Sequence, residues 1–288
     1  MKLQIFTSAN LAYAPQAAVM LESIRRFEPT ANVVLILVDE IPADGSYGNF
    51  LQSFDEVVTA RELLGDLHDS WMAPYSVVEA CTSVKGPALE MLLERGGQVI
   101  YLDPDTALFS PLEKFCEQLA CCSILLTPHQ LRPNSADNPY IADEIDSLRH
   151  GIYNFGVFGV RPTPEGQAFA KWWSQRLAKH SVDDPMRGLF TDQKWGDHIP
   201  VFFPDSEIHR EAGLNVASWN LHLRPFSLDS FGNYLVDGSP LVLYHFSKIT
   251  HLGKAASLPK LLDNPLAADL IRFYLERLEY WTAQFLPK

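Results

Sequence analysis

The sequence predicts an α/β fold with a central, mainly parallel but mixed β-sheet flanked by helices. Short apolar segments alternate with segments of helical periodicity, and no linker rich in glycine, serine or proline divides the 288 residues. Apolar runs of this kind are typical of strands that are buried on both faces. A chain of this length is also long enough to bury the core of one large α/β domain. We therefore expect a single domain over residues 1–288.

Six apolar segments are predicted to be strands. They are residues 3–7, 33–38, 99–102, 124–127, 155–160 and 241–244. Between the first two, apolar side chains recur every three or four positions over residues 15–27, which predicts the helix of a right-handed βαβ unit. Residues 85–97 predict a second helix, with a proline near its first turn and glycines after its end.

The remaining chain predicts one irregular segment and one long helix. Residues 127–151 are polar, contain three prolines and show no clear period, and long irregular segments of this kind are often functional. Leu270, Tyr274 and Leu278 lie at helical spacing within residues 261–285, so we expect a helix that buries one face on the domain.

Composition excludes several classes of function. The net charge is -12, which argues against a nucleic-acid partner and against a polybasic membrane anchor. No stretch approaches the roughly 20 apolar residues of a membrane span. The apolar stretch at the start of the sequence is too short for the apolar core of a signal segment. We therefore expect no membrane span and a cytoplasmic protein. The four cysteines lack CxxC spacing, which favours reduced core thiols over a zinc site.

Polar residues follow the first two predicted strands, where ligands of open α/β sheets bind. The first strand ends at Thr7, Ser8, Ala9 and Asn10, and the second at Asp39. We include these residues in the candidate nucleotide site. No glycine fingerprint of the GxGxxG or Walker type occurs there, which counts against dinucleotide oxidoreductases and P-loop NTPases.

The third predicted strand delivers Asp103, Pro104 and Asp105 at its carboxyl end. Proline favours extended geometry in the residue before it, so both carboxylates are expected to point the same way. Such carboxylates repel each other unless a cation lies between them, and oxygen ligands suit Mg²⁺ or Mn²⁺. The alternative is an ordinary turn, but the apolar residues on both sides favour a metal site, where such ions usually also bind substrate phosphates.

Three further side chains have both a functional and a structural interpretation. His245 follows an apolar strand and is predicted to be the third metal ligand, although a histidine at a strand end is often structural. Lys85 either meets a diphosphate or is solvated, and His129 either contacts substrate or packs in its loop. Trp219 either stacks on a sugar or is buried, whereas Trp173 and its neighbour at 172 are expected in the core.

Residues 99–112, with the sequence VIYLDPDTALFSPL, resemble the DxD segment of GT-A glycosyltransferases, especially glycosyltransferase family eight. Three more segments resemble family motifs in the expected order: YNFGV at 153–157, TDQKW at 191–195 and LYHFS at 243–247. The TPH, WW, NVASWNL and HFS segments are similar to a narrower group of bacterial glycosyltransferases. The resemblance covers roughly residues 1–250.

This resemblance implies a single GT-A-like domain with a nucleotide-binding half at about residues 1–112. A donor-sugar and acceptor half would follow at about 113–255, and a C-terminal helix at about 256–288. Residues 136–150 and the helix predicted at 261–285 are expected to shape the acceptor side. The resemblance further implies that Asn154 lines the donor sugar and that Asp192 and Gln193 lie at the reacting centre. The family usually has an aspartate after the first strand, whereas residues 7–10 of this chain, TSAN, contain none. The LYHFS segment at 243–247 also departs from the family motif, so either Lys248 or Lys254 is expected to reach the diphosphate.

We accordingly expect a metal-dependent glycosyltransferase of hexosyltransferase type that uses Mn²⁺ or Mg²⁺. The donor is expected to be a UDP-sugar, and the acceptor a hydroxyl-bearing glycan, lipid-linked molecule or protein. The resemblance implies retention of anomeric configuration. Two alternatives stay open: a nucleotidyltransferase that acts on sugar phosphates, and a catalytically silent GT-A-like binding module.

Overall fold

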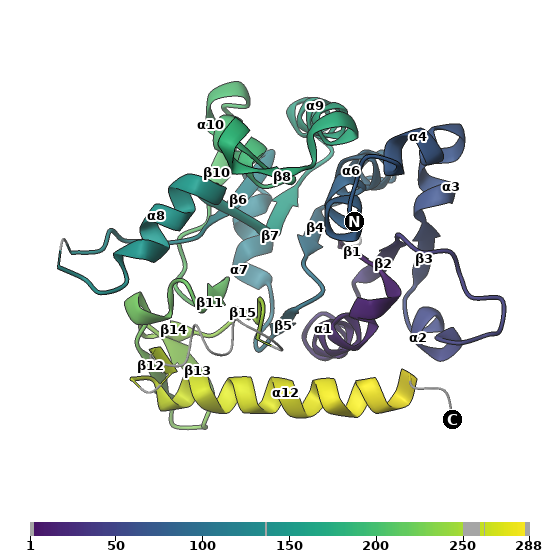
Figure 1. The fold of residues 1–288 in the computed structure, drawn as a ribbon. Helices are drawn as coiled ribbons and strands as arrows, with labels where there is room; N and C mark the ends of the chain where they lie inside the picture. The colour runs from purple at the N-terminus through teal and green to yellow at the C-terminus, as the bar shows by residue number, and fades with distance from the viewer. Residues whose placement is uncertain (1–2, 136, 250–259, 262, 286–288) are drawn as a thin grey trace.

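Buried apolar strands assemble into a seven-stranded mixed sheet in the order β10-β6-β7-β4-β1-β2-β3 (Figure 1). This computed structural model describes residues 3–135, 137–249, 260–261 and 263–285. The strands are β1 Gln4–Ala9, β2 Asn32–Leu37, β3 Glu56–Thr59, β4 Val99–Leu102, β6 Ile124–Pro128, β7 Tyr153–Val160 and β10 Ser206–Ile208. Four neighbouring pairs are parallel, while β7 is antiparallel to both β4 and β6. The predicted α/β fold with a mixed sheet is confirmed.

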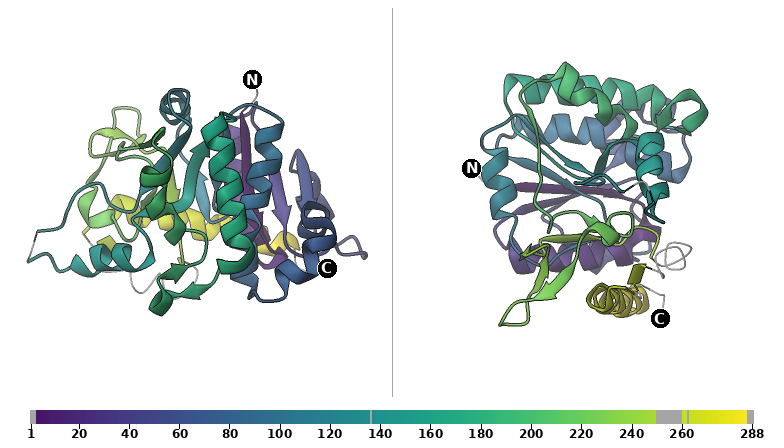
Figure 2. Two further views of the ribbon diagram at one scale, coloured as in Figure 1. Left: turned by 90° about the horizontal axis from the view of Figure 1, so that it is seen from above. Right: turned by 90° about the vertical axis from the view of Figure 1, so that its left-hand side faces the viewer.

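Helices cover both faces of this sheet (Figure 2). On one face lie α6 (Lys85–Glu94) and α9 (Pro164–His180), and on the other α1 (Ala14–Phe27) and α7 (Glu113–Leu119). Alternation along β1 explains this, because Ile5 packs in the cluster with α1 whereas Phe6 packs in the cluster with α6 and α9. The two helices predicted at residues 15–27 and 85–97 are therefore present as α1 and α6.

Shorter helices connect these elements. The α-helices are α2 Gly48–Gln52, α3 Ala60–Leu64, α4 His68–Met72, α5 Val77–Ser83 and α10 Ile199–Phe202. The 3₁₀ helices are η1 Leu11–Tyr13, η2 Gly65–Leu67, η3 Pro185–Arg187, η4 Lys194–His198 and η5 Leu221–Leu223. Capping boxes begin α3 and α5, in which Thr59 pairs with Glu62 and Ser76 with Glu79.

A second sheet corrects the placement of residues 241–244. The late strand β15 (Leu243–His245) lies between β11 (Val216–Ala217) and β5 (Thr106–Leu108), outside the central sheet. Burial on both faces made this segment look like a central strand, but a small sheet covered by a helix buries its strands equally well. The other small strands are β12 Phe226–Leu228, β13 Tyr234–Val236, β14 Ser239–Pro240, β8 Asp183–Asp184 and β9 Leu189–Phe190.

The segment at residues 127–151 is not irregular throughout, because it contains helix α8 (Ile141–His150). None of its side chains is buried, and polar contacts hold it in place. The Asn134 N–H donates to Glu144 Oε2 at 2.8 Å, and Lys194 Nζ donates to the Leu148 carbonyl at 2.8 Å. Ile141, Ile145 and Leu148 recur at helical spacing within it, so the expectation of a segment without a period overlooked this signal. All three side chains are exposed in the structure.

The C-terminal helix α12 (Pro265–Phe285) packs against α1 and shares a hydrophobic cluster with the second sheet (Figures 1 and 2). It begins at Pro265, later than expected, because proline is favoured in the first turn of a helix. The Tyr274 ring stacks on Phe246 with centroids 3.9 Å apart. The expected docking of this helix is confirmed. No helix among the described residues has the length and the apolar character needed to cross a membrane.

Candidate functional site

The turn after β4 carries the two aspartates of the predicted metal site. The Thr106 N–H and Thr106 Oγ1 both donate to the Asp103 carbonyl, at 3.1 and 2.8 Å, and this closes a tight turn around Pro104. Strand β5 follows immediately and pairs antiparallel with β15, with Thr106 opposite His245. The Phe246 N–H also donates to the Asp105 carbonyl at 2.8 Å. This pairing brings His245 beside the two aspartates, although about 140 residues separate them in sequence.

The three predicted ligands converge. His245 Nε2 lies 3.0 Å from Asp105 Oδ1 and 3.7 Å from Asp103 Oδ2. One ligand atom from each residue lies within 4.8 Å of the others. Burial by itself lowers the pKa of His245, but the Asp105 and Asp103 carboxylates outweigh it and raise this pKa above its usual value. Two carboxylates and an imidazole make a donor set that suits Mn²⁺ or Mg²⁺ completed by phosphate oxygens.

Gly156 on β7 forms the floor of this cluster. A Cβ atom at this position would lie 2.4 Å from His245 Cε1, 2.7 Å from Asp103 Oδ2 and 2.8 Å from Asn154 Oδ1. Real Cβ contacts are never so short, so any side chain here would displace the proposed ligands. The Asp103 N–H donates to the Gly156 carbonyl at 2.8 Å, which fixes the turn against this strand.

A buried charge cluster lies directly behind Asp103. Lys85 Nζ is 3.2 Å from Asp103 Oδ1, 2.9 Å from Asp192 Oδ2 and 4.1 Å from the centroid of the Tyr101 ring. Burial by itself lowers the pKa of Lys85, but the two carboxylates raise it well above its usual value. Lys85 is therefore a buried cation that is already paired, not a solvated residue.

The 191–193 motif lies beside this cluster. Thr191 has φ of 44°, a left-handed conformation that is unfavourable for a β-branched residue. Its Oγ1 donates to Asp192 Oδ1 at 3.0 Å, and Trp173 Nε1 donates to the Asp192 carbonyl at 3.2 Å. Gln193 Oε1 accepts from Asn154 Nδ2 at 3.1 Å. Local strain with multiple compensating contacts is characteristic of functional sites.

His129 and Trp219 border the cluster on the side of β6. The ring centroid of Trp219 lies 5.4 Å from that of His129 and 5.2 Å from that of His245. Burial lowers the pKa of His129 to about 4, so its imidazole is neutral at pH 7. Trp219 is half-buried, and its ring connects His129 with the proposed metal ligand.

The remaining predicted residues lie at the ends of β1, β2 and β15. Thr7, Ser8 and Ala9 are buried, Asn10 is half-buried, and Asp39 Oδ2 accepts from the Leu11 N–H at 2.6 Å. Lys248 is exposed and has φ of 59°, while Lys254 lies outside the described residues. The contacts thus place Asp103, Asp105, His245, Lys85, Asn154, Asp192, Gln193 and His129 together. The nucleotide contacts of residues 7–10 and Asp39 stay predictions.

Sequence reasoning missed Tyr101. Its hydroxyl donates to Asp103 Oδ1 at 2.7 Å and lies 3.1 Å from Ser8 Oγ, so it links β1 to the site. Burial raises its pKa well above the usual value. Alternation along β4 was the available signal, because residues two apart on a strand share a face and Tyr101 precedes Asp103 by two.

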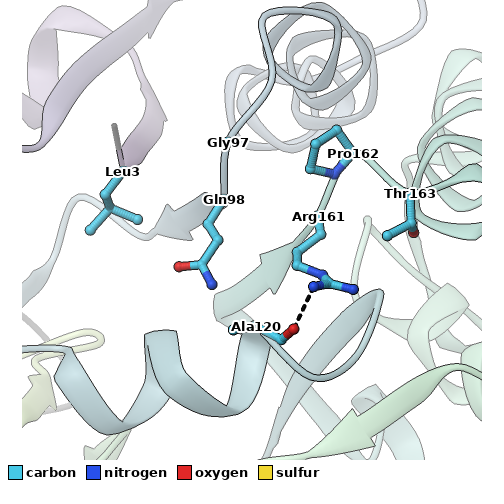
Figure 3. Close-up of a pocket in the computed structure, with 7 residues that line it drawn as sticks. All are labelled: Leu3, Gly97, Gln98, Ala120, Arg161, Pro162 and Thr163. Carbon is cyan, nitrogen blue, oxygen red and sulfur yellow. Dashed lines mark hydrogen bonds between the residues drawn. The ribbon is translucent and has the colours of Figure 1, made fainter. Parts of the chain in front are cut away.

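A pocket of about 500 Å³ lies near the amino ends of β1 and β4, opposite the carboxyl ends of the strands (Figure 3). It is lined by Leu3, Gly97, Gln98, Ala120, Arg161, Pro162 and Thr163. Leu3 and Gln98 precede β1 and β4, whereas Asp103 follows β4. This pocket is therefore separate from the Asp103 cluster, and Arg161 within it donates to the Ala120 carbonyl.

Known proteins share parts of this chain. It is 29% identical over 174 residues to the uncharacterized protein YfnF of Bacillus subtilis (strain 168), which is 59% of this chain and 56% of YfnF. It is 25% identical over 177 residues to YfnD of the same organism, which is 60% of this chain and 54% of YfnD. The chain thus spans about half the length of the curated relatives it matches.

A solved structure shows the same fold. The crystal structure of an active-site mutant of LgtC is 12% identical and superposes with a TM-score of 0.50, covering 91% of this chain and 96% of LgtC. This likeness concerns the fold alone and agrees with the expected GT-A architecture.

A family model identifies the chain more directly. The model of the nucleotide-diphospho-sugar transferases matches residues 75–234, which is more than half of the 288 residues. The matched segment contains Lys85, Asp103, Asp105, Asp192 and Gln193. The chain therefore belongs to the nucleotide-diphospho-sugar transferase family.

Proposed function

We propose that this chain is a metal-dependent glycosyltransferase that moves a sugar from a nucleoside diphosphate sugar to a hydroxyl acceptor. The observation that supports this most is the convergence of Asp103, Asp105 and His245 within 4.8 Å at the carboxyl end of β4. Ligands of open α/β sheets bind beyond the carboxyl ends of the strands. Family membership supplies the class of donor.

The residues of the cluster fit a divalent metal ion. Asp103, Asp105 and His245 would hold Mn²⁺ or Mg²⁺, and donor phosphate oxygens would complete its coordination. When bound, the ion supplies Lewis acidity that neutralises charge on the departing diphosphate. The missing side chain of Gly156 leaves space for these ligands, because a Cβ atom at this position would clash with His245 and Asp103.

The chain's own residues orient Asp103. Its Oδ1 accepts from Tyr101 at 2.7 Å and from Lys85 at 3.2 Å. Its Oδ2 is thereby directed towards His245, which lies 3.7 Å away. Partners of this kind orient metal ligands and support affinity. Asp192 also pairs with the Lys85 ammonium, so the positive charge of Lys85 is shared between the two carboxylates. Asp103 therefore keeps part of its negative charge for a metal ion.

The resemblance to glycosyltransferase family eight supplies the finer proposals. We take UDP as the nucleotide, a hexose as the transferred sugar, and retention as the stereochemical course. Thr7 to Asn10 and Asp39 would contact the nucleoside, and Lys248 or Lys254 the diphosphate. The acceptor would be a hydroxyl-bearing glycan, lipid-linked molecule or protein, met in the cytoplasm.

A nucleotide-sugar hydrolysis screen with Mn²⁺ tests the function without knowledge of the acceptor. We expect slow, Mn²⁺-dependent release of one nucleoside diphosphate, and chromatography of the products identifies both the donor and the anomer. Binding of a nucleoside triphosphate in preference to the diphosphate would instead indicate a nucleotidyltransferase. Binding of neither, with or without Mn²⁺, would indicate a silent module and contradict the proposal.

A further inference from the structure

Gln193 belongs to a motif that resembles one at the reacting centre, and its side chain makes three hydrogen bonds within the protein. Its Oε1 accepts from the Phe155 N–H at 3.2 Å and from Asn154 Nδ2 at 3.1 Å. Its Nε2 donates to the His150 carbonyl at 3.0 Å. The residue is 8% exposed. Three of the four hydrogen-bonding positions of this amide are therefore used by neighbours within the protein.

These contacts fix the orientation of the Asn154 amide. The Phe155 N–H can only donate, so the Gln193 atom that faces it must be the carbonyl oxygen, and the Asn154 atom next to that oxygen must be its NH₂ group. Asn154 Oδ1 then accepts from the Gly156 N–H at 3.2 Å. His129 agrees with this orientation, because its Nδ1 lies 3.3 Å from the Ile152 carbonyl and donates to it. Its Nε2, 3.4 Å from Asn154 Nδ2, is then the acceptor of the neutral ring.

The orientation of Asn154 in turn decides the tautomer of His245. Asn154 Oδ1 lies 3.3 Å from His245 Nδ1, so Nδ1 carries the proton and donates to it. His245 Nε2 is then the atom that faces Asp105 and Asp103, at 3.0 and 3.7 Å. The Asp105 carboxylate can only accept, so without a metal ion Nε2 carries a proton too, and a metal ion would have to replace that proton. The hydrogen bond to Asn154 then keeps the remaining proton on Nδ1, which leaves Nε2 as the ligating nitrogen.

We infer that Gln193 is a positioning residue that keeps Nε2 of His245 available to the metal by holding the Asn154 amide in one orientation. This inference rests on the metal site of the proposed function. A reversed Asn154 amide would place its NH₂ group against the Gly156 N–H and against His245 Nδ1. His245 would then have to accept at Nδ1 and carry its proton at Nε2, where it blocks coordination.

Two substitutions of Gln193 separate this role from a merely structural one. Gln193→Glu keeps an oxygen that accepts from Asn154 and Phe155, whereas Gln193→Met keeps the approximate volume but removes the acceptor. Both lose the donor to His150, so each controls for that contact. In the presence of UDP, we expect Gln193→Met to weaken Mn²⁺ affinity by about 10-fold, the lower end of effects for groups behind a metal ligand. Gln193→Glu should stay within about 2-fold of the wild type.

A readout that needs no metal is the proton on His245 Nδ1. In the wild type its hydrogen bond to Asn154 should give a slowly exchanging downfield NMR resonance, assigned by its loss in His245→Gln. We expect Gln193→Glu to retain this resonance and Gln193→Met to lose it. Should the wild type bind no Mn²⁺ even with UDP, the proposed function fails, but this resonance still decides the role of Gln193.

The Asn154→Asp background gives a second test. A carboxylate presents an oxygen to His245 Nδ1 in either orientation, so Gln193 is no longer needed to choose between them. Gln193→Met should therefore leave Mn²⁺ affinity unchanged in this background, a non-additive pair. Retention of the Nδ1 resonance in Gln193→Met, equal losses of affinity in Met and Glu variants, or additive effects with Asn154→Asp would each overturn the inference.

Discussion

Gly156 is the residue whose missing side chain makes room for the proposed metal ligands. We expect Gly156→Ala to weaken Mn²⁺-dependent UDP binding by at least about 10-fold, since His245 and Asp103 must move away from a Cβ at 2.4 and 2.7 Å. Calorimetry with Mn²⁺ and with EDTA measures this loss.

Gly159 on the same strand provides the matched control. A Cβ there would lie 2.7 Å from Leu119 and 2.9 Å from Phe115, far from the ligands. Gly159→Ala should therefore cost about 1–3 kcal/mol of stability through overpacking but leave metal-dependent binding intact. Equal binding by Gly156→Ala and the wild type would contradict the placement of the site.

Lys85 is the buried cation whose loss should be costly. Lys85→Met leaves Asp192 buried without its partner at 2.9 Å, and removing one member of a buried ion pair costs about 3–5 kcal/mol. We expect this decrease in the free energy of unfolding from urea titration. Lys85→Met combined with Asp192→Leu should recover most of it, because no unpaired carboxylate then remains at position 192. A single variant as stable as the wild type would show that Lys85 is not an essential partner.

His209 makes stability depend on pH in the acid range. Burial lowers its folded-state pKa to about 4, whereas a histidine in the unfolded chain titrates near 6.5. The unfolded state therefore binds the proton first, and stability that is present above pH 6.5 is lost as the pH falls towards 4. Between pH 7 and pH 5 this group should contribute a loss of about 2 kcal/mol.

His209→Asn isolates this contribution. His209 Nδ1 lies 2.9 Å from Gln118 Oε1, and the asparagine NH₂ group can replace that donor without titrating. Urea titrations at pH 7 and pH 5 should show a smaller loss in the variant than in the wild type. An identical loss would assign the pH dependence to other groups, among them His129, whose pKa is also about 4.

At the scale of elements, α12 stabilises the second sheet that carries His245. Its Tyr274 ring stacks on Phe246, the residue after His245, at 3.9 Å. We expect Tyr274→Ala to cost about 3–5 kcal/mol, as for other buried aromatic truncations, and to weaken metal-dependent UDP binding as well. Tyr274→Phe keeps the ring and should cost far less. Chemical unfolding and calorimetry on both variants measure this, and normal binding by a destabilised Tyr274→Ala would separate α12 from the site.

Helices and strands differ in how clearly the sequence predicts them. The segments that became β4 and α1 were visible because their burial is continuous or periodic. Strands β3 and β10 lie at the two edges of the central sheet and include exposed or half-buried polar residues, so no apolar run marked them. Helix α8 has a local signal, because Ile141, Ile145 and Leu148 recur at helical spacing, but it buries none of its residues. Its contact with Lys194 is one that no local pattern records.

For the whole molecule, ligand binding should be visible as stabilisation. A ligand that binds only the folded state at 100 times its Kd adds about 2.7 kcal/mol, which for a chain of this size raises Tm by about 5 °C. We expect UDP with Mn²⁺ to give such a shift, and UDP with EDTA to give much less. Asp105→Ala should fold normally and show no Mn²⁺-dependent shift. Equal shifts with Mn²⁺ and EDTA would contradict the metal site and the proposed function with it.

The sequence by itself determined the α/β class, the strand that carries Asp103 and Asp105, and the candidacy of His245. These follow from local information, since burial periodicity and the chemistry of neighbouring side chains are written in consecutive residues. Only the tertiary structure placed β15 in a second sheet, paired Lys85 with Asp192, and connected Gln193 through Asn154 to His245. Such contacts join residues as many as 139 positions apart, as Thr106 and His245 are, and a hydrogen bond or ion pair depends on distances that folding alone establishes.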